Sequence, residues 1–196
     1  MRRCALACCQ RTQVSHASSS RKTWRRFRYR DAGLGHHFLR HHPASSAAAA
    51  GHNFSSPSNR FWITLHRAGF TPRLLCADEE RLLLDYGCGI TAAVSRATPR
   101  AADLTRDELA AAVGPLAKKI RRLAPNTIAF LGKAAYAAVH GPGEIAWGRQ
   151  DAPFDGANVW VLPNPSGLNR GFSLDQLVVA YAQLRHAVAQ VLPAPA

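Results

Sequence analysis

The chain has 196 residues and a formal net charge of +13, a length that suits one α/β domain with a full core and is short for two. No window approaches eighteen consecutive apolar residues, so the composition excludes a membrane-spanning helix. The charge is uneven, because residues 1–50 hold ten of the 25 Lys and Arg but only one of the 12 acids, and residues 51–196 are mildly basic.

Residues 1–43 are rich in Arg, Ser and His and carry three of the five cysteines. Three interpretations fit this segment: an organelle transit peptide, a basic arm that contacts phosphates, and an incorrectly translated stretch. Its cysteines and histidines lack the spacing of a metal-ligand loop. Cys76 and Cys88 stand alone in the rest of the chain, so we expect a reducing compartment and no zinc site.

From residue 51 on, apolar residues recur at helical or strand spacing between capping and turn residues. The expected elements, in chain order, are a helix over 58–70 that begins at a Ser58 cap and ends at Gly69, a short helix over 78–84, a helix from the Thr105–Glu108 capping box to about Arg122, a buried strand over 126–132, a helix over 133–140, a strand over 159–162, and a helix over 173–192 with a Ser173–Gln176 capping box. Residues 141–156 form a polar segment between two of these elements.

The alternation of strands and helices predicts a parallel sheet with helices on both faces. In such sheets, ligands bind beyond the carboxyl ends of the strands. The stretch 163–170 directly follows the apolar run 159–162 and contains Asn, Pro, Ser and Gly, a composition typical of an exposed turn whose backbone can approach a partner closely. This turn therefore lies at the predicted working edge of the domain.

Five separated stretches, taken together and in this order, resemble the mismatch-specific uracil/thymine-DNA glycosylases of the Mug/TDG type, within the uracil-DNA glycosylase superfamily. They are GHNFSSPSNRFW (51–62), HRAGFTPRLL (66–75), YGCGIT (86–91), AFLGKAAY (129–136) and VWVLPNPSGLN (159–169). The resemblance runs from about residue 44 to about residue 188, roughly three quarters of the chain.

The resemblance implies a three-layer α/β/α domain with a short, mainly parallel central sheet over residues 44–192, followed by a tail over 193–196. It also implies a monomeric, monofunctional enzyme of base-excision repair. Such an enzyme extrudes uracil, mismatched thymine or a related damaged pyrimidine from G/U or G/T mispairs in double-stranded DNA and hydrolyses its N-glycosidic bond. No metal, cofactor or membrane is implied, and the expected location is that of the chromosome, most simply a bacterial cytoplasm.

In this family an Asn-Pro-Ser-Gly loop enters the duplex where the base has left, and residues 164–167 match it. Leu168 can fill the vacated stack, Gly167 lets the backbone approach the sugar-phosphate chain, and Asn169 and Arg170 offer donors to a base edge or a phosphate. The implied site residues are Asn164 for the base pocket and Ser166, Gly167, Leu168, Asn169 and Arg170 for the DNA wedge. A plainer interpretation of this stretch is an ordinary strand-to-helix connection.

Phe54 matches the family aromatic that stacks on the flipped base. In single-strand binding, such stacking contributes about 1–3 kcal/mol per base. A second interpretation is that Phe54 fills the core beside Phe61 and Trp62, and the sequence leaves both open.

Three basic residues are candidate phosphate contacts, namely Arg60, Lys133 and Arg170. Asn59, which precedes Arg60, is expected to be structural, because a polar residue there caps the following helix. The basic residues near position 120 are instead expected to form a solvated helix face.

The family's second motif, Gly-Ile-Asn-Pro followed by Gly or Ala, aligns with RHHPA (40–44). The last two residues match, but Arg, His and His replace Gly, Ile and Asn. The family Asn positions the attacking water, so the corresponding catalytic position here is His42, whose imidazole could orient or deprotonate water. This departure predicts impaired activity.

Upstream, GLGHHFLRHH (33–42) stands where the family has a hydrophobic first strand. With four histidines and an arginine, this run is expected to be too costly to desolvate as the central strand of a buried parallel sheet. One hypothesis covers the region: read one nucleotide later, the codons of His-His-Phe-Leu-Arg-His (36–41) can encode Ile-Ile-Phe-Cys-Gly-Ile. We therefore hypothesise a frameshift that ends close to Pro43.

Two further function classes are compatible with the sequence. A non-catalytic binder of mismatched or damaged DNA would keep the loop and the pocket but release no base. A nucleotide-binding α/β module is disfavoured, because no Gly-rich phosphate loop follows a first strand.

Overall fold

The computed structural model of the chain describes residues 36–40, 52–92 and 105–189. Within these ranges, none of the helices has the length and apolar character needed to cross a membrane. His42, the rest of the RHHPA motif after Arg40, and residues 1–35 lie outside the described residues. The interpretations made for those positions therefore stay predictions.

Within the described part of the chain, five strands form one mixed sheet in the order β2-β1-β3-β5-β4. The strands are β1 (His36–Arg40), β2 (Cys88–Ala92), β3 (Thr127–Leu131), β4 (Gly148–Phe154) and β5 (Ala157–Leu162). β1 pairs in parallel with both β2 and β3, and β3 pairs in parallel with β5. β4 is antiparallel to β5 and forms the edge of the sheet. The expectation of an α/β fold is confirmed.

The structure corrects one expectation at the first strand, because His36–Arg40 does form a strand inside the sheet, hydrogen-bonded on both sides. Main-chain pairing does not depend on the side chains. Phe38, at the middle of the strand, is fully buried among aromatic rings. The expectation that this run is not a strand of the sheet was therefore wrong, and the sheet includes residues that the sequence assigns to the N-terminal segment.

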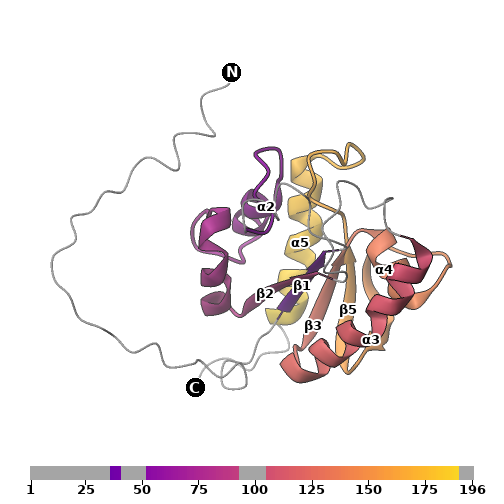
Figure 1. Ribbon diagram of the computed structural model, residues 1–196. Coiled ribbons are helices and arrows are strands. Elements are labelled where there is room, and N and C mark those ends of the chain that lie inside the picture. Colours follow the sequence, from indigo (N-terminus) through magenta and orange to yellow (C-terminus); the bar gives the residue numbers. More distant parts are fainter. Residues whose placement is uncertain (1–35, 41–51, 93–104, 190–196) are drawn as a thin grey trace, which may run out of the picture.

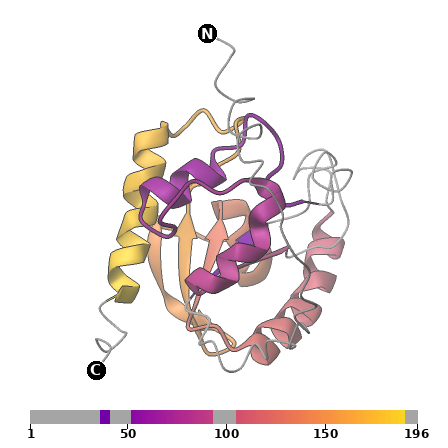
Figure 2. The same ribbon diagram turned by 90° about the vertical axis from the view of Figure 1, so that its left-hand side faces the viewer.

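Helices cover both faces of the sheet, as Figure 1 shows. One face carries α2 (Phe61–Arg67), the 3-10 helix η1 (Ala77–Tyr86) and α5 (Leu174–Ala189), which stand in front of the sheet in Figure 2. The other face carries α3 (Arg106–Leu123) and α4 (Lys133–His140).

The sheet divides the buried side chains of the described residues into two clusters. Ala129 and Leu131 of β3 belong to the cluster beneath α2 and α5, whereas Ile128 and Phe130 belong to the cluster beneath α3 and α4. This division follows from the strand geometry, because successive side chains point to opposite faces. β3 is buried at all five positions, as the apolar run predicted.

The two predicted capping boxes are confirmed. The Thr105 side chain accepts from the Glu108 N–H at the start of α3, and the Ser173 hydroxyl accepts from the Gln176 N–H at the start of α5. The predicted Ser58 cap is wrong, because α2 begins at Phe61. β4 was also missed, since the segment expected to be a polar connection contains an edge strand whose residues are alternately exposed.

Candidate functional site

Residues 163–173 connect the end of β5 to the start of α5, and we call this segment the carboxyl-edge loop. It leaves the sheet at the carboxyl ends of the parallel pair β3 and β5, which is the edge that the sequence predicted. Figures 1 and 2 both show it beside the segment 52–60 that precedes α2. Two stretches distant in the sequence therefore build this part of the surface.

The loop is held in shape by hydrogen bonds among its own residues. The Asn164 side-chain oxygen accepts from the Ser166 N–H at 3.0 Å, and the Ser166 hydroxyl accepts from the Leu168 N–H at 3.3 Å. The Asn169 side chain donates to the Asn164 carbonyl at 2.8 Å and accepts from the Gly171 N–H at 3.2 Å. Asn164, Ser166 and Asn169 thus have a local role that fits Asx-type turns.

Arg60, a candidate phosphate contact, is directed at the carboxyl-edge loop. Its two terminal nitrogens donate to the carbonyls of Phe172 at 2.7 Å, Ser166 at 2.9 Å and Asn169 at 2.8 Å. Its backbone N–H donates to the carbonyl of Pro165 at 3.0 Å. The guanidinium is therefore occupied by the protein's own main chain.

Gly167 lies against the segment before α2. A Cβ atom at this position would stand 2.5 Å from the Ser58 carbonyl oxygen and 2.6 Å from the Ser58 Cβ. Real Cβ atoms do not come this close to a backbone oxygen. The close approach that the sequence suggested at Gly167 is thus present, but in this structure it is made to Ser58.

Tyr181 of α5 fixes the start of the loop. Its fully buried hydroxyl donates to the Pro163 carbonyl at 3.1 Å. Burial raises the pKa of Tyr181 well above its usual range, and the nearby Arg60 opposes this only in part. The phenol therefore stays protonated and remains a donor to the loop. The sequence predicts a helix around Tyr181, but no pattern in it indicates that the Tyr181 hydroxyl binds the Pro163 carbonyl.

The tip of the loop is exposed. Leu168 has 84% of its surface accessible, the largest value among the exposed large hydrophobic side chains of the described residues. Arg170, two residues on, is also exposed. A single exposed leucine needs no explanation on an ordinary surface, but this one stands on a loop whose backbone is fixed on both sides of it.

Phe54 is 9% exposed, and its ring stacks on Phe61 with the ring centroids 4.0 Å apart and the planes at 19°. The structure thus shows the core contact that the sequence left as one of two interpretations. The backbone of Phe54 has a φ of 54°, a left-handed conformation that is rare for a bulky residue. Such conformations cluster at functional sites, where the surrounding structure enforces them.

Lys133 lies two residues beyond Leu131, the last residue of β3, at the same edge as the loop. Its ammonium is 4.9 Å from the ring centre of Trp147, which is 42% exposed. Trp147 in turn meets Phe172 of the loop edge to face, with the ring centroids 5.2 Å apart. Trp147 was missed in the sequence, although a lone tryptophan in the polar segment 141–156 was a signal that could have marked it.

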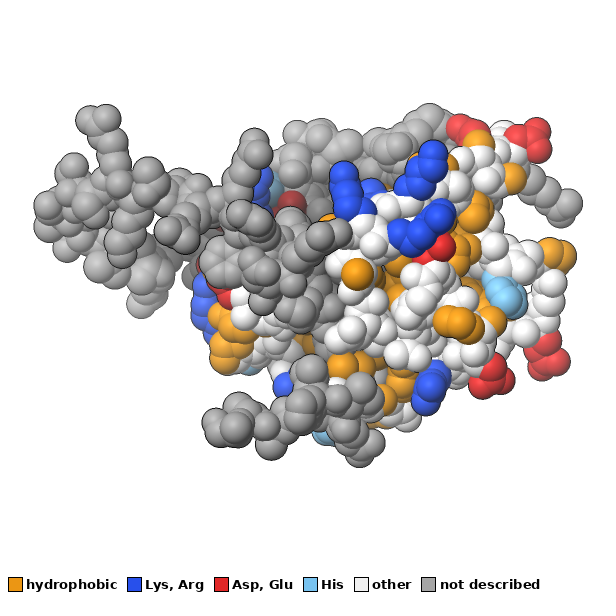
Figure 3. Space-filling view, turned by 90° about the horizontal axis from the view of Figure 1, so that it is seen from below, with side chains coloured by type: hydrophobic (Ala, Val, Ile, Leu, Met, Phe, Trp, Pro, Cys, Tyr) orange, Lys and Arg blue, Asp and Glu red, His pale blue; other side chains and the backbone are white. Residues whose placement is uncertain are grey.

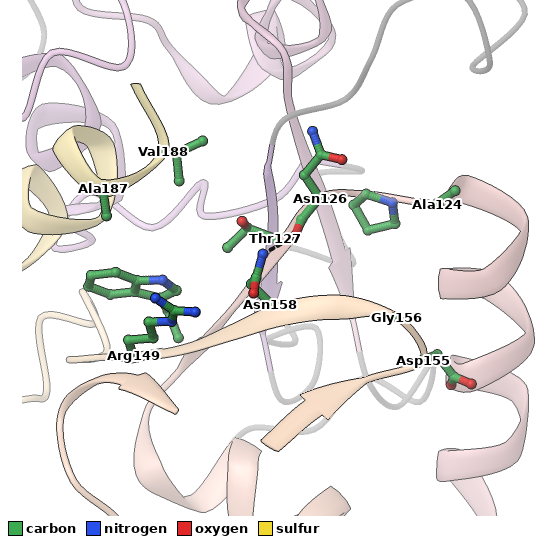
Figure 4. Close-up of a pocket in the computed structure, with 11 residues that line it drawn as sticks. Ala124, Asn126, Thr127, Arg149, Asp155, Gly156, Asn158, Ala187 and Val188 are labelled. Carbon is green, nitrogen blue, oxygen red and sulfur yellow. Dashed lines mark hydrogen bonds between the residues drawn. The ribbon is translucent and has the colours of Figure 1, made fainter. Parts of the chain in front are cut away.

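A cavity of about 440 Å³ lies at the opposite end of the sheet. Asn126, Thr127 and Asn158, at the amino ends of β3 and β5, line it together with Arg149 (Figure 4). Seen from this end, the surface mixes basic, acidic and apolar side chains (Figure 3). The cavity is thus remote from the carboxyl-edge loop and is not a pocket for a base held there.

Among the described residues, no group of three or more His, Cys, Asp or Glu side chains is placed to hold a metal ion. The side chains of the carboxyl-edge loop and its neighbours include amides, hydroxyls, aromatic rings and the cations Arg60, Lys133 and Arg170. These groups can contact bases and phosphates and can stack on bases.

The molecule is thus an α/β protein with a fixed loop and an exposed apolar tip at the carboxyl edge of its sheet. The sequence model of the uracil DNA glycosylase superfamily matches residues 33–185. The chain belongs to this superfamily. The match begins before β1 and ends within α5, so it includes the five strands that the structure describes and the whole carboxyl-edge loop.

Proposed function

We propose that this protein is a DNA glycosylase of the Mug/TDG type, which removes uracil or mismatched thymine from G/U or G/T mispairs in double-stranded DNA. The observation that carries the proposal is the exposed Leu168 at the tip of a loop whose backbone is fixed by Arg60 and Tyr181. An apolar wedge inserted between bases partly unstacks a duplex. A pre-shaped wedge suits an enzyme that must take a base out of the stack.

In this proposal, the carboxyl-edge loop fills the gap left by the extruded pyrimidine. Leu168 enters the stack, and Arg170 contacts the opposite base or a neighbouring phosphate. The base is held against Phe54, whose ring is backed by Phe61 at 4.0 Å. The N-glycosidic bond then breaks while the sugar carries positive charge in the transition state, and a bound water attacks the sugar carbon.

We also propose that turnover is slow. The water-positioning residue of the family would be an Asn at position 42, where this chain has His42. The carboxyl-edge loop itself, residues 163–173, contains no Asp or Glu that could serve as a strong general base in its place. Binding and base extrusion depend on the loop and are expected to survive this replacement better than hydrolysis does.

The test is the release of free base from a duplex with one G/U mispair, compared with the same duplex carrying a G/C pair. Free uracil from the mispaired duplex only is the expected result. Binding of the mispaired duplex without release of base would instead support a non-catalytic binder of mismatched DNA, a second function that His42 at the water-positioning site favours. If the protein neither binds the mispaired duplex more tightly than the G/C duplex nor releases base from it, both functions are contradicted.

Lys133 is proposed to contact a phosphate beside the loop. We expect Lys133→Met to weaken duplex binding to a similar degree on damaged and undamaged DNA, and to lower the slope of log K against log salt by about 1. Binding isotherms between 50 and 200 mM salt, roughly the range in which such slopes are measured, check this. Lys118→Met is the matched control, because Lys118 is an exposed lysine of α3, outside the carboxyl-edge loop and its neighbouring segments. An equal change in both variants would contradict the assignment.

A further inference from the structure

The main-chain carbonyls of the carboxyl-edge loop are bound from one side by a single residue. Arg60 donates to the carbonyls of Pro165, Ser166, Asn169 and Phe172, three of them through its guanidinium. Ser166 and Asn169 lie on either side of the tip, two residues before and one residue after Leu168. Arg60 therefore binds the loop backbone on both sides of the exposed Leu168.

This arrangement suits arginine and no other side chain. A guanidinium is planar and carries five N–H donors in a fixed fork, so it can reach several carbonyls at once. A lysine ammonium is a single point and cannot span the three carbonyls that Arg60 reaches. The Arg60 Nε atom is buried and has no hydrogen-bond partner among the described residues, so the three loop carbonyls are bound by the two terminal nitrogens alone.

The conformation held by Arg60 has a consequence for binding. A free loop loses conformational entropy when a partner orders it, about 1–2 kcal/mol for each backbone residue fixed. A loop that is populated in its binding conformation only part of the time binds with an affinity reduced by that fraction. A residue that fixes the loop beforehand therefore strengthens binding without touching the partner.

We propose that Arg60 is the positioning residue of the DNA wedge: it fixes the carboxyl-edge loop so that Leu168 is presented to the gap before DNA arrives. This inference rests on the proposed function and assigns to Arg60 a role different from a phosphate contact. It acts through Leu168 and not through the DNA itself. Its removal should therefore affect gapped or lesion-bearing duplex and leave undamaged duplex nearly unchanged.

The experiment compares Arg60→Met with the parent on two probes, a duplex with a tetrahydrofuran abasic site opposite guanine and the undamaged duplex. The readout is the ratio of the two dissociation constants, which needs no catalysis. We expect Arg60→Met to lower this preference by about tenfold or more, in the range of losing hydrogen bonds to a charged donor. Arg67→Met is the matched control, because Arg67 lies on the same side of the molecule in α2 and forms an exposed ion pair with Asp175. The preference of this variant should stay unchanged.

A double-mutant cycle distinguishes two roles of Arg60: positioning Leu168, or contacting the DNA independently of Leu168. If Arg60 acts through Leu168, the variant Arg60→Met with Leu168→Ala should show the same preference as Leu168→Ala alone. Additive losses would overturn the inference, because they would mean that Arg60 and Leu168 act separately. Arg60→Lys, which keeps the charge, should lose most of the preference, whereas full retention by this variant would show that charge alone suffices and would also overturn it.

The outcomes distinguish this inference from the function on which it rests. A parent protein without any preference for the abasic duplex would overturn the proposed wedge, and the role of Arg60 with it. A parent preference that Arg60→Met retains would overturn the role of Arg60 alone. Near-UV circular dichroism shows whether each variant is folded, and if Arg60→Met does not fold, the comparison of Arg60→Lys with Arg67→Met on the same two probes decides the question.

Discussion

Replacement of Phe38 by alanine is expected to lower the free energy of unfolding by about 3–5 kcal/mol, the usual cost of truncating a buried phenylalanine. Phe38 is fully buried, and its ring lies 5.6 Å from Phe61, 5.3 Å from Phe70 and 6.1 Å from Tyr181, measured between centroids. These three rings come from α2, the turn after it and α5. The loss would be a large part of the stability of a typical domain, about 5–15 kcal/mol.

Urea unfolding followed by circular dichroism measures this change. Leu168→Ala is the matched control, because Leu168 is 84% exposed and an exposed substitution usually changes stability by less than about 0.5 kcal/mol. An unfolding midpoint that is the same for Phe38→Ala and the parent would mean that residues 36–40 do not form the strand between β2 and β3.

Gly167→Ala is expected to displace the carboxyl-edge loop and to weaken binding of lesion-bearing duplex by about tenfold or more. The added Cβ would stand 2.5 Å from the Ser58 carbonyl oxygen. Relieving such overpacking costs about 1–3 kcal/mol, which corresponds to roughly a factor of 5 to 150 in an equilibrium. The measurement is the affinity for a duplex with an abasic site.

Gly171→Ala is the control within the same loop, because a Cβ at Gly171 meets its nearest atom at 3.5 Å, an ordinary contact. Its affinity should stay within about twofold of the parent. Adding Ser58→Gly to Gly167→Ala should not restore binding, because the clashing carbonyl belongs to the backbone and remains. If Gly167→Ala binds as tightly as Gly171→Ala does, the loop is not held against Ser58 as the structure shows.

The sequence predicted most of the helices and strands whose ends or interiors are marked by neighbouring residues. The capping boxes at Thr105 and Ser173 and the apolar runs of β3 and β5 depend on neighbouring residues only, so they could be read from the chain. The placement of the carboxyl-edge loop followed from these strands, because parallel strands end at the same edge.

The remaining features depend on contacts between distant residues. β1 lacks an apolar pattern and is a strand because β2 and β3 pair with it on both sides. Arg60 and Ser58 contact a loop more than 100 positions away along the chain. A basic residue near a DNA-binding motif suggests a phosphate contact, and nothing local indicates that its donors are used within the protein.

The frameshift hypothesis stays a prediction. The buried residue of β1 would be the same with or without the frameshift. Both readings of codons 36–41 have phenylalanine at position 38, the one side chain of β1 that the structure describes. The out-of-frame reading would place Ile, Cys and Gly around it in place of His, Leu and Arg. Nucleotide sequencing across residues 30–45, together with the mass of the N-terminal peptide, tests the hypothesis; an unbroken frame matched by the peptide mass would dispose of it.

The central claim is that the carboxyl-edge loop plugs the space left in a duplex by an extruded pyrimidine. Its most direct test is the affinity of the variant Leu168→Ala with Arg170→Ala for a duplex with a G/U mispair and for the matched G/C duplex. We expect the variant to lose at least about tenfold in affinity for the mispaired duplex and little for the matched one. Equal affinity of the variant and the parent for the mispaired duplex would contradict it.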